Sequence, residues 1–322
     1  MLPDDAKQHK LRVLLTGGSG FVGSYVLRAL RARNYAVRVL RRSPGDFTSS
    51  DSGISDPGIS DSGIEAAPGD VTDPDSVRAA AVGCHAVVHL VGIIEENPRA
   101  GITFERIHVE GTRNVVEAAR SAGIDTFVHM SANRAAPDGE TAYLTTKWRA
   151  EEIVRGAGFT HWTVFRPSII FGKPASGQPE FATRLLQTLV KPFPIWPVFG
   201  DGAYRLQPIA VEDVAEAFAR AVSDPAFSGK SYCTAADVSF PYVEILDMLA
   251  LGAGMKPRPK FHVPIWMAKP VIELMAPLRV LPITPEQLEM LIGGNTCDAS
   301  DFLSDLALEP KPFTVENLSY LR

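Results

Sequence analysis

Residues 17–23 read Gly-Gly-Ser-Gly-Phe-Val-Gly, and this stretch decides the fold of the chain. It follows an apolar run at residues 11–16 and precedes a helical pattern at residues 25–30, so it lies where a buried strand turns into a helix. Such a turn needs backbone angles that glycine adopts most easily, and a pyrophosphate can approach it only where no Cβ intervenes. The N–H groups that begin the helix then bind the phosphates. We therefore predict a dinucleotide site formed by Gly17, Gly18, Ser19, Gly20, Phe21, Val22 and Gly23.

The composition is that of a globular protein, with 322 residues, 45% of them hydrophobic and 21% charged. This length allows one large domain or two smaller ones. The formal charge of −5 argues against a nucleic-acid partner, which would require a basic surface. The first residues are polar, and no stretch offers about 18 uninterrupted apolar residues. We therefore expect a cytoplasmic protein without a membrane span.

The three cysteines, Cys84, Cys233 and Cys297, are scattered and lack the spacing of metal ligands. We expect them to be reduced thiols that are buried as small apolar side chains. The sequence therefore predicts neither a disulfide nor a bound metal.

Strand and helix patterns alternate as far as residue 172 and predict an α/β Rossmann fold with a doubly wound parallel sheet. Beyond residue 173 prolines interrupt the alternation. We therefore divide the chain into a dinucleotide-binding domain at residues 1–172 and a smaller, irregular substrate lobe at residues 173–322, with room for returns to the Rossmann core. Expected strands after the glycine turn lie at residues 36–40, 65–71, 86–92, 127–130 and 161–166; expected helices lie at 74–82, 103–122, from 143, near 180–190, and at 212–223, 241–252 and 264–279.

Residues 50–64 repeat one five-residue unit three times, Ser-Asp-Ser-Gly-Ile with Pro in place of the second Ser in the middle copy. Three isolated isoleucines cannot build a core, so we predict a flexible loop inserted between the second and third strands. A calcium site at Asp51, Asp56 and Asp61 is the alternative, although their spacing matches no known type of calcium loop.

Two arginines, Arg41 and Arg42, follow the second expected strand, where a dinucleotide fold faces the adenosine ribose. A carboxylate there would bind the 2′-hydroxyl of NAD, whereas arginine accepts the 2′-phosphate of NADP. The alternative is a solvated basic strand end. We predict NADP as the cofactor, with NAD as the second candidate.

Further cofactor contacts are expected where other strands end. Asp70 can bind the adenine amino group, or it can cap the helix that begins at Pro74. The strand over residues 86–92 is expected to end beneath the cofactor, where glycine allows a close approach, and His89 within it is expected to be a packed side chain. The remaining predicted cofactor contacts are Val71, Leu90, Val91, Gly92 and Pro167.

Tyr143 and Lys147 are four residues apart in an expected helix and therefore lie on one face, one turn apart. An unperturbed phenol is a poor acid or base at neutral pH, but a neighbouring ammonium favours the phenolate and lowers its pKa. Lys147 can do this and also hold the nicotinamide ribose. We predict that Tyr143 exchanges a proton with a substrate oxygen that Ser131 or Asn133 polarises. The acidic continuation of the helix, residues 151–152, is expected to face solvent.

Together these motifs resemble the extended and atypical short-chain dehydrogenase/reductase superfamily, which includes the NAD-dependent epimerases and dehydratases. The resemblance covers essentially the whole chain. Its sequences stand at residues 17–23, 69–71, 109–114, 143–147, 166–172 and 207–215. Residues 129–132, 166–172 and 284–288 are most similar to bacterial relatives of the nucleotide-binding accessory subunit of mitochondrial complex I. Two positions depart from the family pattern, since Asn133 replaces the usual Ser or Thr and His108 replaces the usual Asn.

The resemblance implies two candidate functions. The first is an NADP-dependent oxidoreductase, or an enzyme similar to the epimerases and dehydratases, that acts on a carbonyl, quinone or sugar-type substrate. The second is a non-catalytic NADPH-binding accessory or assembly factor of a respiratory or quinone-handling complex.

The segment at residues 264–281 is strongly apolar, but its prolines interrupt it too often for it to span a bilayer. One expectation is a helix packed on the substrate lobe. The other follows from Trp266, Lys269 and Arg279, because aromatic and basic side chains beside apolar ones suit a helix at a membrane surface. It predicts peripheral association with the inner face of the cytoplasmic membrane.

Overall fold

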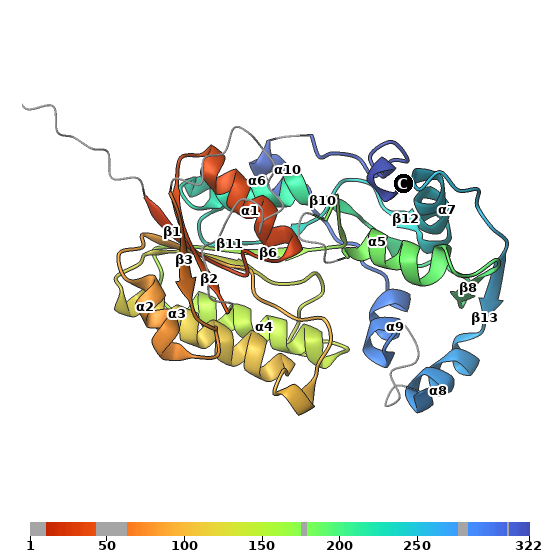
Figure 1. Cartoon of the computed structure of the whole chain (residues 1–322), viewed down its shortest axis with the longest axis horizontal. Helices are drawn as coiled ribbons and strands as arrows, with labels where there is room; N and C mark the ends of the chain where they lie inside the picture. The colour runs from red at the N-terminus through yellow and green to blue at the C-terminus, as the bar shows by residue number, and fades with distance from the viewer. Residues whose placement is uncertain (1–10, 43–62, 175–178, 276–282, 308) are drawn as a thin grey trace, which may run out of the picture.

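A seven-stranded parallel sheet forms the centre of the protein, in the order β11-β6-β5-β4-β1-β2-β3. The structure, a computed structural model, describes residues 11–42, 63–174, 179–275, 283–307 and 309–322 (Figure 1). The strands are β1 (Arg12–Thr16), β2 (Ala36–Arg41), β3 (Ile64–Pro68), β4 (Ala86–His89), β5 (Thr126–Met130), β6 (His161–Pro167) and β11 (Lys230–Thr234).

Helices cover both faces of this sheet (Figure 1). One face packs against α1 (Phe21–Ala32), α6 (Val211–Ala221) and α10 (Ser300–Leu306), and the other against α2 (Pro74–Ala81), α3 (Gly111–Ser121) and α4 (Ala142–Gly156). Because both faces are shielded from water, β1 and β4 are buried almost throughout, as their continuous apolar runs predict. The predicted doubly wound Rossmann fold is confirmed.

Two strands end earlier than the sequence predicts, so the residues that follow them lie in loops. β4 ends at His89, so residues 90–92 form a loop at the carboxyl edge of the sheet. β3 ends at Pro68, so residues 69–71 also lie in a loop. The expected strands at 86–92 and 65–71 are therefore too long at their ends. Parallel strands place these loops at the edge where dinucleotide folds bind their ligands.

Polar side chains fix where the helices begin. The Thr141 hydroxyl accepts the Leu144 N–H and starts α4. Asp73 caps α2, so the alternative role of Asp70 as that cap is wrong. The expected helix at 103–122 is a π-helical turn, η2 (Glu105–Glu110), that continues into α3, and the Thr103 hydroxyl accepts an N–H at its start.

The rest of the C-terminal half is assembled from short elements. Its helices are α5 (Phe181–Leu185), the π-helical η3 (Leu186–Val190), α7 (Tyr242–Gly252), α8 (Ile265–Met275) and α9 (Pro285–Ile292), with the single 3₁₀ turns η4 (Pro225–Phe227) and η6 (Ser319–Leu321). A further 3₁₀ turn, η1 (Pro98–Ala100), follows β4 in the N-terminal half. The paired short strands are β7 (Ile170–Phe171) with β10 (Ile209–Ala210), β9 (Arg205–Leu206) with β12 (Phe240–Pro241), and β8 (Trp196–Phe199) with β13 (Lys260–Val263). β11 leaves this half to pair with β6, so a strand from beyond residue 172 completes the central sheet.

The return of β11 also brings two cysteines together. Cys233 in β11 and Cys297 form a disulfide with their Cα atoms 6.3 Å apart, whereas Cys84 is a buried free thiol. The expectation of three reduced thiols is therefore wrong for this pair. The sequence does not predict this disulfide, because the two cysteines are 64 positions apart and approach each other only when β11 joins the central sheet.

Several sequence-based expectations fall outside the described residues. They concern most of the repeat at 50–64, including Asp51, Asp56 and Asp61, and Arg279 in the apolar segment. Within the described ranges, no group of three or more His, Cys, Asp or Glu side chains is placed to hold a metal ion. Among the same residues, no helix has the length and apolar character needed to cross a membrane.

Candidate functional site

The glycine turn joins β1 to α1 at the carboxyl edge of the sheet. Gly17 has a φ of 78°, and a Cβ there would stand 3.2 Å from the backbone of Leu90 and Val91. A Cβ on Gly23 would overlap the carbonyl oxygen of Gly17, so α1 can pack this close only with glycine at both positions. Among the described residues, no side chain caps the start of α1 at Gly20. Within this part of the chain the first N–H groups of the helix therefore lack a side-chain acceptor, as a pyrophosphate site requires.

The adenosine end of the predicted cofactor site lies where β2 and β3 end side by side. Arg41 closes β2 and is half-buried, and Arg42 follows it on the surface. Asp70 follows β3, and its Oδ1 accepts both the N–H and the hydroxyl of Thr72 at 2.9 Å. Val71 is buried, and its carbonyl accepts the Asn114 amide at 2.8 Å. These bonds shape the loop that carries Asp70 and leave no role for it in capping α2.

Tyr143 and Lys147 project from the first two turns of α4. The half-buried Tyr143 ring packs edge-on against Phe104 and His108, at centroid distances of 5.7 and 5.5 Å. Lys147 is buried, and its ammonium donates to the Met130 carbonyl at 2.8 Å. A Cβ on Gly92 would lie 3.2 Å from Lys147 Nζ. The lysine thus lies between the ends of β4 and β5, at the edge of the sheet where the glycine turn also lies.

Burial shifts the two pKa values in opposite directions. It raises the pKa of Tyr143 to about 12 and lowers the pKa of Lys147 to about 8, because it disfavours phenolate and ammonium alike. The Glu151 carboxylate acts against the second shift and favours the charged lysine. Burial is the only cause that acts on the Tyr143 pKa within the described residues. The expected lowering of that pKa by Lys147 is therefore not found there.

His108 positions the Tyr143 side of the site through both ring nitrogens. Its Nδ1 lies 3.0 Å from the Thr146 hydroxyl, and its Nε2 lies 3.1 Å from both the nitrogen and the carbonyl oxygen of Ile93. The ring is therefore held at both nitrogens, by α4 on one side and by the loop after β4 on the other.

Two further imidazoles lie beneath the lysine, from adjacent positions of β4 and β5. His89 hydrogen-bonds the hydroxyls of Thr16 at 2.6 Å and Thr112 at 3.1 Å, which makes it the packed side chain that the sequence predicts. It stacks on His129, whose ring nitrogens have no hydrogen-bond partner among the described residues. Burial lowers the pKa of His89 to about 3 and of His108 to about 2, and it holds that of His129 well below the usual value. The lysine is the cation of this cluster.

The side chains of Asn133 and Ser131 differ in whether their polar atoms already have hydrogen-bond partners. The Asn133 amide donates to Asn295 Oδ1 at 2.6 Å and to the Thr296 carbonyl at 3.3 Å, and its Oδ1 accepts the Arg134 N–H. Both amide hydrogens are therefore used within the protein. The Ser131 Oγ is buried without a partner in the described part of the chain. Pro167 lies beneath this loop, and its carbonyl accepts the Asn133 N–H at 3.0 Å.

The segment at residues 293–297 contributes to the site although its sequence contains no motif that indicates this. Arg134, which has a positive φ of 68°, donates to the Gly294 carbonyl at 3.1 Å and pairs with Glu140 at 2.6 Å. Gln207 accepts the Cys297 N–H at 2.9 Å. The one sequence feature that points to this contribution is Asn133, because an amide in place of the usual hydroxyl requires additional hydrogen-bond partners.

Glu151 corrects the expectation that residues 151–152 face solvent. It is fully buried on α4 and pairs with Arg155 and with Arg166, the latter at 2.6 and 2.8 Å. Glu152 is half-exposed as expected. The charges at positions 147, 151 and 155 recur every four residues, a pattern that indicates a single charged face. This face ties α4, and with it the tyrosine and the lysine, to β6.

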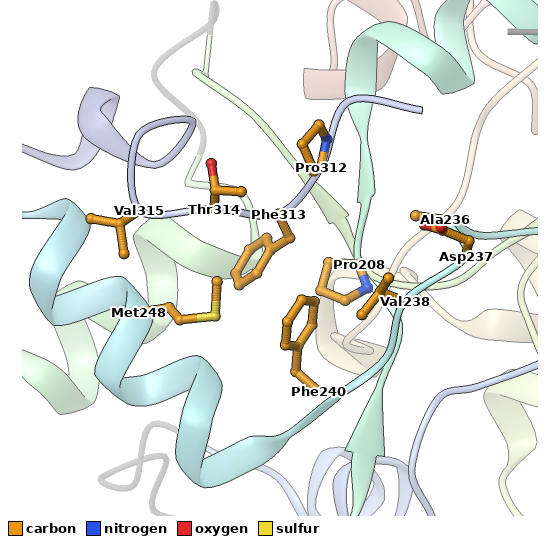
Figure 2. Close-up of a pocket in the computed structure, with 10 residues that line it drawn as sticks. All are labelled: Pro208, Ala236, Asp237, Val238, Phe240, Met248, Pro312, Phe313, Thr314 and Val315. Carbon is orange, nitrogen blue, oxygen red and sulfur yellow. The ribbon is translucent and has the colours of Figure 1, made fainter. Parts of the chain in front are cut away.

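A pocket of about 400 Å³ lies in the C-terminal half, with almost entirely apolar walls. Figure 2 shows the rings of Phe240 and Phe313 at its centre, between Pro208 and Met248. None of its ten lining residues is a predicted cofactor or catalytic residue. One lining residue, Pro208, follows Gln207 directly, and the Gln207 side chain accepts the Cys297 N–H.

Comparisons with known proteins extend this description. The model of the NAD dependent epimerase/dehydratase family matches residues 13–233, from β1 into β11. The chain is 30% identical over 247 residues to the ceramide reductase of Caulobacter vibrioides, covering 76% of this chain and 72% of that protein. It is 25% identical over 255 residues to the mitochondrial NADH-ubiquinone oxidoreductase 40 kDa subunit of Neurospora crassa. That match covers 79% of this chain but 64% of the subunit, less than two thirds of its length.

Solved structures agree with the fold. The dTDP-glucose 4,6-dehydratase DesIV of Streptomyces venezuelae, a double mutant with NAD and DAU bound, matches with a TM-score of 0.70 at 20% identity. The match covers 97% of this chain and 95% of that one. At this identity the likeness supports the fold alone.

Proposed function

Because the chain belongs to the NAD dependent epimerase/dehydratase family, we propose that it is a dinucleotide-dependent oxidoreductase in which Tyr143 and Lys147 act on a carbonyl or hydroxyl group. One observation carries the proposal. The buried Lys147 ammonium lies at Gly92 and Met130, at the edge of the sheet where the glycine turn lies, with Tyr143 one helical turn before it. The relative named ceramide reductase supports a carbonyl substrate of low polarity over a nucleotide sugar.

The glycine turn at residues 17–23 would hold a dinucleotide, which would supply the hydride for the carbonyl carbon. Tyr143 donates the hydroxyl proton to the carbonyl oxygen, and solvent returns a proton to the phenolate. The buried Lys147 ammonium would hold the nicotinamide ribose. Ser131, whose Oγ is buried without a partner among the described residues, is the better group to polarise the substrate oxygen, because Asn133 has no amide hydrogen left.

The test of this chemistry is Tyr143→Phe. NADPH and NADH oxidation by the wild type is screened with quinones, ketones, aldehydes and nucleotide sugars. Tyr143→Phe should abolish turnover with any substrate found while cofactor affinity stays nearly unchanged, because only the proton-transferring oxygen is removed. Lys147→Ala should reduce both. Turnover that survives in Tyr143→Phe would remove this residue from the mechanism.

The cofactor is proposed to be NADP, held at its 2′-phosphate by Arg41 and Arg42. Their position at the ends of β2 and β3, beside Asp70, supports this preference, because guanidinium groups form charge-assisted bonds to phosphate. Replacing Arg41 with Asp and Arg42 with Ala should weaken NADPH binding far more than NADH binding in calorimetric titrations. Equal losses, or a wild type that prefers NADH, would contradict the assignment.

A second candidate function is a non-catalytic, NADPH-binding accessory factor of a respiratory or quinone-handling complex. The commitment of the Asn133 amide to Asn295 and Thr296 favours it, as does the likeness to the Neurospora 40 kDa subunit. This function predicts a nucleotide that copurifies with the protein, remains bound through dialysis and is not oxidised by any compound in the screen. Ready exchange of the nucleotide, together with turnover, would exclude it.

A further inference from the structure

Large apolar side chains on the surface are concentrated at one end of the molecule. Thirteen are exposed among the described residues, and eight of them belong to β13, to α8 or to the loop before β8. Figure 1 places these elements at the end of the C-terminal half farthest from β3 and α2. We call this set the α8 surface; it consists of Phe193, Ile195, Phe261, Ile265, Trp266, Met267, Val271 and Leu274.

The helix α8 has more apolar side chains than its packing uses. Only Ala268 and Ile272 are buried, against a small cluster that includes Leu288 of α9. Trp266 and Leu274 are each 77% exposed. Trp266, Pro270 and Leu274 follow each other at four-residue spacing, and so do Met267 and Val271, so these five form one broad outward stripe. A helix of a globular protein normally turns such a stripe inward.

The strand next to α8 enlarges the same surface. β13 pairs with β8, which places Phe261 opposite Pro197 at the outer edge of the C-terminal half. Phe261 is 63% exposed. Phe193 and Ile195 come from the loop that leads into β8, and the Arg258 guanidinium fixes that loop through three of its carbonyls. The apolar side chains are therefore presented by ordered backbone.

The charges around the α8 surface are cationic, although the whole chain carries a formal −5. Residues 191–199 and 256–275 contain five lysines and arginines and one acidic residue, Glu273. Lys260 pairs with Asp247, and Lys269 pairs with Glu289. The other three cations, Lys191, Lys256 and Arg258, have no acidic partner in the part of the chain that the structure describes.

We propose that the α8 surface docks on an anionic lipid bilayer, with α8 lying in the plane of the interface. Aromatic and aliphatic side chains beside lysines are the combination that binds such a surface, because the apolar stripe enters the acyl boundary while cations meet the headgroups. A two-fold dimer through the same surface would place these cations against one another, so charge favours the anionic bilayer over a second copy of the protein.

Docking of the α8 surface on a bilayer does not depend on the proposed oxidoreductase activity, but it would bring the membrane near the predicted catalytic loop. α8 packs on α9, and the chain after α9 runs directly into Gly294 and Asn295, which hold the loop at Asn133 and Arg134. The docked helix therefore lies one helix away from the predicted catalytic loop.

Flotation of the full chain with vesicles tests the proposal. Vesicles of equal parts phosphatidylglycerol and phosphatidylcholine are compared with phosphatidylcholine alone, at low and high salt. We expect the wild type to float with the anionic vesicles at low salt, and to stay at the bottom with the neutral vesicles. The double variant Trp266→Asp, Leu274→Asp should lose flotation, and Lys191→Glu with Lys256→Glu should reduce it.

The matched control is the double variant Leu11→Asp, Val82→Asp, which places the same two charges at residues that are 48% and 65% exposed in the dinucleotide-binding half. It should float as the wild type does. All variants change exposed side chains, so their circular dichroism and melting temperatures should match the wild type and show that folding is intact. A wild type that never floats would overturn the proposal. So would a dimer, seen by sedimentation, that dissociates in the Trp266→Asp, Leu274→Asp variant, because the surface would then bind a second copy. Neither result depends on turnover.

Discussion

The two walls of the candidate site are built in different ways. The cofactor wall is the continuous stretch at residues 17–23, and its shape follows from backbone packing, since α1 approaches until Gly23 meets the Gly17 carbonyl. The substrate wall at residues 131–134 is held by side chains, and Asn133 finds its partner Asn295 at a distance of 162 residues in sequence. The backbone packing of the cofactor wall leaves no space for a side chain at Gly23, whereas the hydrogen bonds that hold the substrate wall can be removed one at a time by substitution.

The largest expected effect breaks the cofactor wall. Gly23→Ala places a Cβ where the Gly17 carbonyl oxygen stands, so α1 must move away from β1. We expect a loss of more than about 4 kcal/mol of unfolding free energy and no measurable dinucleotide binding. Chemical denaturation and calorimetric titration measure the two effects.

Gly156→Ala is the control for that change. Gly156 ends α4, and a Cβ there would meet nothing within 4 Å. This variant should be unchanged or more stable, by up to about 1 kcal/mol, because alanine favours the helix. Equal behaviour of the two variants would show that the glycine turn is an ordinary loop.

The second effect concerns α4, which supplies Tyr143 and Lys147. Glu151→Ala leaves the Arg155 and Arg166 guanidiniums facing a buried position with no carboxylate. Breaking a buried pair in this way costs about 3–5 kcal/mol. Glu152→Ala removes a half-exposed carboxylate from the same helix and should cost at most about 1 kcal/mol. Similar losses in urea denaturation would mean that Glu151 is solvated rather than buried.

The third prediction uses pH to test whether the three buried histidines near Lys147 stay neutral in the folded protein. His89, His108 and His129 stay neutral in the folded protein because burial lowers their pKa, but they titrate near 6.5 when unfolded. Below that pH the unfolded chain binds more protons, so stability is lost as the pH falls. From about pH 7 to about pH 5.5 each imidazole should remove about 1 kcal/mol.

Denaturant midpoints measured along this pH series check the sum, about 3 kcal/mol for the three rings. His89→Gln should flatten the slope. A midpoint that stays constant down to about pH 5.5 would mean that the imidazoles are solvated or charged in the folded state.

The smallest expected effect sharpens the description of the substrate wall. In a double-mutant cycle of Asn133→Ala and Asn295→Ala, the bond between their amides should appear as a coupling of about 1 kcal/mol. The pair Asn133→Ala and Asn114→Ala, in which Asn114 bonds the Val71 carbonyl instead, should be additive. An additive result for the first pair would leave the wall without the support proposed for it.

How far the sequence predicts this molecule follows from the same contrast. The glycine turn, the buried strands and the helix that carries Tyr143 are local patterns, so they were found within a few residues of their ends. The strands expected at 65–71 and 86–92 are too long, because the apolar residues Val71, Leu90 and Val91 continue beyond the strand ends at Pro68 and His89. An apolar run in the sequence therefore does not show at which residue a strand stops pairing with its neighbour in the sheet.

The contacts that were missed join distant segments. β11 has the short sequence Lys-Ser-Tyr-Cys-Thr, whose two apolar residues are adjacent and show no strand alternation, and only its pairing with β6 identifies it as a core strand. The Cys233–Cys297 disulfide and the Asn133–Asn295 bond depend on that pairing and on the path after α9. Glu151 was misplaced for a different reason, because a buried carboxylate is recognised only when the strand that carries Arg166 is packed against it.

The position of β11 late in the chain also determines when the central sheet can be completed during protein synthesis. β6 is complete at Pro167, yet its outer edge has no partner until Lys230–Thr234 has been synthesised. During that interval the nascent chain presents unpaired strand amides and an uncovered Phe165 ring, which later packs against Tyr232 and Phe227. Open strand edges of this kind recruit other chains. A fragment cut after residue 172 would keep that edge permanently, so the dinucleotide-binding half should aggregate when expressed alone and remain in solution only when the chain continues through β11.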